Sequence, residues 1–209
     1  EQRDSGLNYL SFMKTRDLIL QKTFGLLLAK GYDGVSVSDI QQNTGMARGL
    51  LYHYFGGQEA LFNEAAEKYL NDWFRVDKEE VRAKTVGELI VFTLEKYNRV
   101  GQEIADCFGQ GVVLADVEML FFEVMRHNRE FAGHYRAIRE NRAAAWKTAL
   151  LNSFSAGELR SGLNLASVAR QLNHIIDGVA IDRGSGENMP EVVYEIEKEL
   201  KGFCELICR

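Results

Sequence analysis

The chain has 209 residues, 46% hydrophobic and 26% charged, which is the composition of a globular protein and excludes disordered and fibrous classes. Its formal net charge of −5 argues against a protein that coats nucleic acid along its whole length. No segment reaches the roughly eighteen apolar residues of a membrane span, and no signal-peptide pattern opens the chain, so we expect a cytoplasmic protein without membrane contact.

The scarcity of proline indicates an all-α protein of about nine helices. Pro190 is the single proline, and the alternation of β-branched residues that is typical of strands is absent. Cys107, Cys204 and Cys208 form no CxxC pair, and an odd cysteine count suits a reducing compartment. Cys204 and Cys208 could share a metal, but no further ligands stand nearby, so we expect no metal or cofactor.

The N-terminal segment predicts a helix-turn-helix. Residues 1–13 show no clear period and are expected to form a mobile lead-in, and a first helix follows from about Thr15 to Lys30. Ser36 and Asp39 have the spacing of a capping box, which predicts a helix over 37–44. Gly45 supplies a turn, and a second helix over 48–55 packs one face and leaves the other free for contact.

The run from Thr15 to Phe62, TRDLILQKTFGLLLAKGYDGVSVSDIQQNTGMARGLLYHYFGGQEALF, resembles the N-terminal domain of the tetracycline-repressor-like (TetR) bacterial regulators. The resemblance implies a three-helix DNA-binding domain over 14–57 and an antiparallel helical bundle over 58–209 for ligand binding and dimerisation. It further implies a homodimeric repressor that binds a double-stranded operator and is released by a small-molecule effector.

Two positions depart from the family pattern. Ala47 stands where the family usually has Ser or Thr, so we expect the cap of the second helix to be lost. Gln58 stands where the family usually has a Lys near a phosphate, and Gly57 replaces a capping Ser, so we expect a weakened phosphate contact.

The DNA-contact candidates lie in the one segment with a basic balance, since residues 14–58 carry five basic and three acidic groups. Arg48 can reach a guanine edge or a phosphate, and Tyr52 and Tyr54 can donate to phosphates unless one of them belongs to the core. The candidates are Lys14, Thr15, Ser36, Ser38, Ala47, Arg48, Gly49, Leu50, Tyr52, His53, Tyr54 and Gln58.

Beyond this domain, apolar periodicity predicts helices over about 58–73, 86–100, 112–126, 130–154, 165–179 and 190–207, with a solvated connection at 75–84. The first of these has a ladder of apolar residues at every fourth position and is expected to link the two domains. The glycines at 101, 109 and 111 are expected to separate helices.

The last two helices are more apolar than one side of a small bundle requires, so the resemblance implies a four-helix dimer interface. The alternative is that they close the core of the chain itself. The interface candidates are Leu165, Val168, Leu172, Ile175, Ile176, Val179, Val192, Val193, Ile196, Leu200, Phe203 and Ile207.

Aromatic and polarisable residues could line an effector pocket between the helices, with Phe122 or Trp146 at its centre, although aromatics at helical spacing also occur as plain core. The candidates are Phe92, Tyr97, Phe108, Phe121, Phe122, Met125, Phe131, Tyr135, Trp146 and His174. A metal could be bound by His127, Glu130 and His134. The alternative is that these side chains are solvated groups near a helix end.

Two other functions stay open from the residues alone. A helical enzyme is disfavoured because no GxSxG, HExxH, P-loop or dinucleotide glycine pattern occurs. A helix-turn-helix used only for protein contacts would explain the modest basic balance and Gln58.

Overall fold

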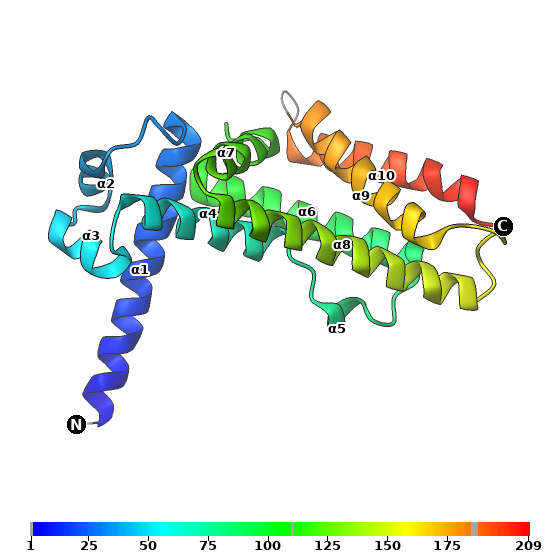
Figure 1. Ribbon diagram of the computed structural model, residues 1–209, viewed down its shortest axis with the longest axis horizontal. Helices are drawn as coiled ribbons and strands as arrows, with labels where there is room; N and C mark the ends of the chain where they lie inside the picture. The colour runs from blue at the N-terminus through cyan, green and yellow to red at the C-terminus, as the bar shows by residue number, and fades with distance from the viewer. Residues whose placement is uncertain (1, 110, 185–187) are drawn as a thin grey trace. The chain divides into compact units, whose positions relative to one another are not determined.

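The computed structural model describes residues 2–109, 111–184 and 188–209, and the named elements of this part are all helices, as predicted (Figure 1). They are α1 (Gln2–Lys30), α2 (Val37–Thr44), α3 (Arg48–Phe55), α4 (Gln58–Phe74), α5 (Lys78–Val81), α6 (Val86–Phe108), α7 (Leu114–His127), α8 (Arg129–Ser155), α9 (Leu165–Asp182) and α10 (Met189–Ile207).

The helix starts follow local capping signals in the sequence. Thr85 and Glu88 form a capping box at α6, Asn188 and Glu191 form another at α10, and Asn164 caps α9. These side chains satisfy backbone N–H groups that have no partner within the helix. Most predicted boundaries therefore agree with the structure to within a few residues.

The start of α1 was predicted wrongly. This helix begins at Gln2 rather than near Thr15, so the described part of the expected lead-in is helical. Adding residues to an existing helix is far easier than nucleating one, and no proline stops the helix in this segment. This segment has no clear apolar period, and helix extension does not require one. Whether the segment is mobile stays a prediction.

The polar connection at 75–84 is not simply solvated, as was expected. It contains the short helix α5, whose Val81 is buried, and two asparagines of α8 hold its backbone. Asn141 accepts from Val76 N–H at 2.8 Å and donates to the Val76 carbonyl at 3.1 Å. Asn152 Nδ2 donates to the carbonyl of Lys84 at 2.9 Å. Long-range hydrogen bonds of this kind leave no local sequence signal.

Gly101 does not separate two helices but lies inside α6. A Cβ atom at this position would stand 2.2 Å from Cγ and 2.7 Å from Cβ of Met189 at the start of α10. α10 packs against both α6 and α9, and the missing side chain permits the close approach of α6 and α10.

The chain divides into two compact units. The first consists of the residues up to Tyr69 together with Met119–Ala132, and the second of Leu70–Glu118 together with Gly133–Arg209. The division falls within α4, beyond the predicted border between residues 57 and 58, and α4 is therefore shared by both units. The functional boundaries of the predicted domains stay a prediction.

Each unit has its own apolar core. In the first, Phe24 of α1 packs against Tyr69 of α4 with ring centroids 4.2 Å apart, and against Phe121 of α7 at 6.3 Å. In the second, Trp73, Leu150 and Leu172 are among the most deeply buried residues. None of the helices in the described part combines the length and the apolarity that crossing a bilayer needs.

Candidate functional site

The helix-turn-helix is fixed by short-range contacts at α2. The Ser36 hydroxyl accepts from the Asp39 N–H at 3.2 Å, and Asp39 Oδ2 accepts from the Ser36 N–H at 2.8 Å, which confirms the predicted capping box. Lys30 at the end of α1 forms an ion pair with Asp39. Hydrogen bonds from Lys30 and then from Ser36 hold the pKa of Asp39 well below its usual range. Gly45, with a φ of 72°, ends α2 in the left-handed conformation that the turn requires.

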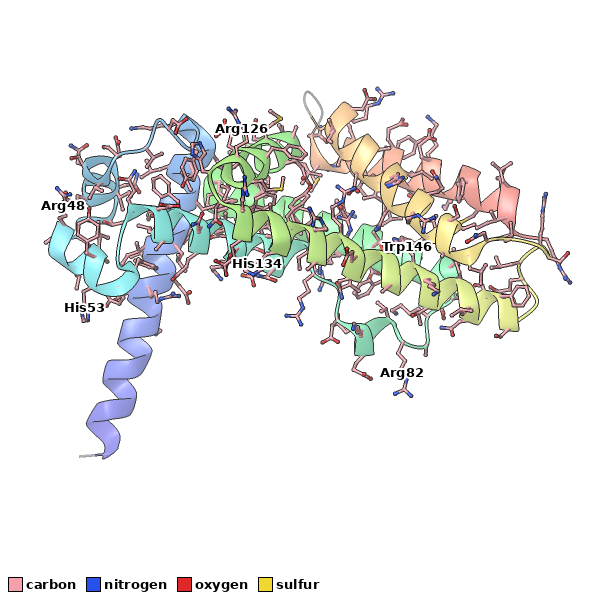
Figure 2. The ribbon with its side chains drawn as sticks, in the orientation of Figure 1. Arg48, His53, Arg82, Arg126, His134 and Trp146 are labelled. Atoms are coloured by element: carbon pink, nitrogen blue, oxygen red, sulfur yellow. The ribbon has the colours of Figure 1, made fainter. Side chains whose placement is uncertain are left out.

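α3 presents two different faces, as predicted. Leu51 and Phe55 are buried, whereas Arg48, Leu50 and His53 are exposed. Tyr52 and Tyr54 are both half-buried, so neither is simply a core residue. Figure 2 labels Arg48 and His53, whose side chains extend away from the ribbon of α3.

Within the exposed face, Arg48 is oriented by Tyr52. Arg48 Nη2 donates to the Tyr52 hydroxyl at 3.0 Å, and its guanidinium lies 5.2 Å from the centre of the tyrosine ring. On the buried side, the Arg16 guanidinium lies 5.1 Å from the centre of the Phe55 ring and pairs with Glu64. Arg16 therefore joins α1, α3 and α4, a structural role that its charge alone did not reveal.

The two departures from the family pattern have visible structural effects. Ala47 occupies the N-cap position of α3 with no side-chain hydrogen bond, as its side chain predicts. Gln58 Nε2 donates to the carbonyl of Val35 at 2.9 Å, so its amide connects the start of α4 to the segment before α2. Whether the phosphate contact is weakened stays a prediction.

The remaining candidate DNA contacts have varied surroundings. Lys14 and Ser38 are exposed, Thr15 is half-buried, and the Ser36 hydroxyl is engaged with Asp39. Gly49 is exposed, and a Cβ atom there would meet nothing within 4 Å. A contact of any of these residues with DNA stays a prediction.

α7 contributes to the first unit in a way that the sequence did not indicate. The Tyr32 N–H donates to Glu123 at 2.8 Å, and the Tyr32 ring stacks on His127 with centroids 4.1 Å apart. Burial raises the pKa of Tyr32. His127 Nε2 also lies 3.5 Å from Asp33, and the described residues contain no group of three or more side chains suited to hold a metal.

Three of the predicted effector contacts meet at a small cavity in the second unit. Phe92 and Tyr97 of α6 and Trp146 of α8 line a space of about 30 Å³, together with Trp73 and Phe74 from the end of α4. Figure 2 labels Trp146 on α8.

The other candidate effector contacts do not line this cavity. Phe121 and Phe131 pack against each other in the core of the first unit, with ring centroids 5.8 Å apart. Phe122, which was expected to be central, is 37% exposed. Phe108 packs edge-on against Trp73, and the Tyr135 hydroxyl donates to Glu118. Met125 is half-buried, and His174 is exposed.

A buried charged cluster borders the same cavity. Arg142 is 8% exposed and pairs with Asp177, which also pairs with Arg139. Arg142 Nη1 lies 3.4 Å from the Tyr97 hydroxyl, and burial raises the pKa of Tyr97 to about 12. The sequence did carry a signal, because Arg142 stands between Ile138 and Trp146 at helical spacing and thus on the buried stripe of α8.

Most of the proposed interface residues are buried within the single chain. This burial is what the alternative predicts, in which the two helices close the chain's own core, and a contact of these residues with a partner chain stays a prediction. The buried residues are Val168, Leu172, Ile176, Val192, Val193, Ile196, Leu200 and Ile207, whereas Leu165, Ile175, Val179 and Phe203 are half-buried. The exposed apolar residues of α9 and α10 are Ile181, Tyr194 and Leu206.

Residues 19–65 match the family model described as bacterial regulatory proteins, tetR family. The uncharacterized HTH-type transcriptional regulator YezE of Bacillus subtilis (strain 168) is 28% identical over 166 residues, covering 75% of this chain and 79% of that protein. The HTH-type transcriptional repressor AcnR of Corynebacterium jeikeium (strain K411) is 22% identical over 176 residues, covering 82% of this chain and 84% of that protein.

The fold is similar to that of solved structures. A TetR transcription regulator from Haloarcula marismortui superposes with a TM-score of 0.75 at 16% identity, covering 94% of this chain and 100% of that one. The matching relatives and the fold are those of transcriptional regulators and not of enzymes. The helix-turn-helix segment over residues 19–65 therefore matches the tetR family, and the chain as a whole is similar in sequence and fold to TetR-family transcriptional regulators.

Proposed function

We propose that the protein is a one-component repressor that binds a pseudo-palindromic operator as a homodimer and is released by a small apolar or amphipathic effector. The observation that carries the proposal is the exposed face of α3, where Arg48, Leu50 and His53 stand opposite the buried Leu51 and Phe55. An exposed helix face of this chemistry, held by a second helix across a short turn, suits a DNA major groove. AcnR, which resembles the chain, is itself described as a repressor.

In this proposal each side chain has a distinct role. Arg48 reads a guanine edge or contacts a phosphate, and Leu50 contacts a thymine methyl group. Tyr52 orients Arg48 through its hydroxyl and donates to a phosphate. The dimer places two copies of α3 in successive major grooves, about 34 Å apart.

Release follows from α4, which is shared by both units. Its N-terminal part belongs to the unit that carries α3, and Trp73 and Phe74 at its other end line the cavity. An effector shifts the equilibrium only if it binds the DNA-incompetent arrangement more tightly. A ligand that displaces these two aromatic side chains acts on the helix that continues into the DNA-binding unit.

The test is a titration of fluorescent DNA fragments from the protein's own promoter region, followed by anisotropy at two salt concentrations. Arg48→Ala should lose about 1–3 kcal/mol of binding free energy if Arg48 contacts a base, mainly on specific DNA. If it contacts a phosphate, affinity should fall on all sequences and the salt slope should drop by about one.

Arg82→Ala is the charge-matched control. The Arg82 side chain is 79% exposed and follows α5 in the second unit, so this variant removes one positive charge from outside the unit that carries α3. Its affinity should equal that of the parent. DNA binding that is absent, or that does not depend on sequence, contradicts the repressor function and favours a helix-turn-helix used for protein contacts.

A further inference from the structure

The cavity in the second unit contains a buried cation with an unused donor. Arg142 uses Nη2 for Asp177 and Nη1 for the Tyr97 hydroxyl, whereas its Nε has no hydrogen-bond partner among the described residues. Arg142 also lines the cavity. A buried N–H group of a charged side chain is costly to leave unpaired, so this donor is suited to an acceptor that enters the cavity.

The charges around the cavity favour an anionic acceptor. Arg139 and Arg142 share the carboxylate of Asp177, which gives two cations for one anion. Lys96 also lines the cavity beside Arg142, although burial lowers the pKa of Lys96 and so favours its neutral form. The second nearby carboxyl group, Glu118, accepts from the Tyr135 hydroxyl at 2.8 Å. Burial raises the pKa of Glu118 and so favours its neutral form. Cationic groups therefore outnumber anionic ones in this cluster, and an added anion would reduce the imbalance.

The other walls of the cavity are largely aromatic. Trp73, Phe92 and Trp146 line it together with the ring of Tyr97, and such side chains suit a flat apolar ligand. Its volume of about 30 Å³ holds roughly one water molecule. A ligand can therefore enter only when side chains move. Phe92 is half-buried, whereas Trp146 is almost fully buried, so Phe92 is the wall residue with more freedom to move.

We propose that this cavity is the closed form of the effector site and that its ligand is a small aromatic carboxylate. The carboxylate accepts from Arg142 Nε and from the Tyr97 hydroxyl, and the ring lies among the aromatic walls. The effect of the ligand rests on the proposed function: in a repressor, binding next to Trp73 would act on α4 and release the operator.

The test titrates the full-length protein with benzoate and 1-naphthoate and records the midpoint of thermal unfolding and the heat of binding. Benzamide and 1-naphthamide are neutral ligands of nearly the same shape, and inorganic phosphate is an anion without a ring. We expect saturable stabilisation by the carboxylates alone. Equal effects of the amides, equal effects of phosphate, or no saturable binding of either carboxylate would each overturn the proposal.

Two tyrosine variants locate the site. Tyr97→Phe keeps the ring but removes one proposed donor, and losing a hydrogen bond to a charged group should weaken carboxylate binding roughly tenfold or more. Tyr135→Phe removes the hydroxyl that donates to Glu118, outside the cavity lining, and should bind as the parent does. If Tyr97→Phe also binds as the parent does, the carboxylate lies elsewhere and the proposal is wrong.

The same ligands are then added to the preformed complex with promoter DNA. Release by the carboxylates, with weaker release from Tyr97→Phe, supports the inference. A protein that binds the operator but neither binds nor responds to the carboxylates contradicts this inference and leaves the repressor function intact. A protein that binds the carboxylates but no DNA contradicts the repressor function and leaves the ligand class intact.

Discussion

The uncapped start of α3 leads to a quantitative prediction. Ala47 already has the extended conformation of an N-cap residue, with φ of −68° and ψ of 147°, and its carbonyl accepts from the Leu51 N–H at 3.2 Å. Only the side-chain acceptor is missing. Ala47→Thr supplies a hydroxyl that can accept from an N–H of the first turn without a change of the backbone.

Such a cap is worth about 1 kcal/mol in the free energy of unfolding. For a chain of this size, that gain corresponds to a rise of about 2–4 °C in the midpoint of thermal unfolding. Because Ala47 is exposed, the added atoms displace no neighbouring core residue, and the cap should provide nearly the whole effect.

The assay is circular dichroism at increasing temperature in the absence of DNA, so that phosphate contacts do not contribute. Ala47→Val is the matched control, because valine has nearly the shape of threonine but no hydroxyl. The threonine variant should unfold at a higher temperature than both the parent and the valine variant. Equal midpoints for the threonine and valine variants would refute the capping argument.

Three further changes test the packing, the interface and the pH dependence. Gly101→Ala should lower the free energy of unfolding in urea by about 1–3 kcal/mol because the added Cβ atom collides with α10. Gly133→Ala adds its Cβ atom in open space on α8 and should raise this free energy by up to about 1 kcal/mol. Tyr194→Glu changes a side chain that is 63% exposed on α10 and should give a folded monomer in light scattering. Leu200→Glu changes a fully buried side chain and should unfold the chain. A dimer that survives Tyr194→Glu places the interface elsewhere. The lowered pKa of Asp39 means that its carboxylate stabilises the folded state at pH values above the unfolded pKa of about 4. This contribution is lost as the pH falls through the folded pKa. The urea midpoints of the parent and of Asp39→Asn should therefore converge in acid.

Several local features of the protein were determined by the sequence alone. The Ser36 and Asp39 capping box and the turn at Gly45 depend on contacts between residues at most four positions apart, and the spacing of Leu51 and Phe55 places them on one face of α3. Such contacts form whenever the helix forms, so residue types at fixed spacing are enough to predict them. The uncapped Ala47 follows from the same short-range argument.

Other features were decided only by the tertiary structure. Periodicity shows that a helix has an apolar face but not what covers that face, and only the structure shows that Leu200 is buried where α10 packs against α6 and α9 of its own chain. The contact of Phe121 with Phe24 of α1 likewise joins residues far apart in the sequence, which no spacing within one helix predicts. The pairing of Arg142 with Asp177 joins residues 35 positions apart, and their meeting depends on how α8 and α9 pack, which no local pattern records.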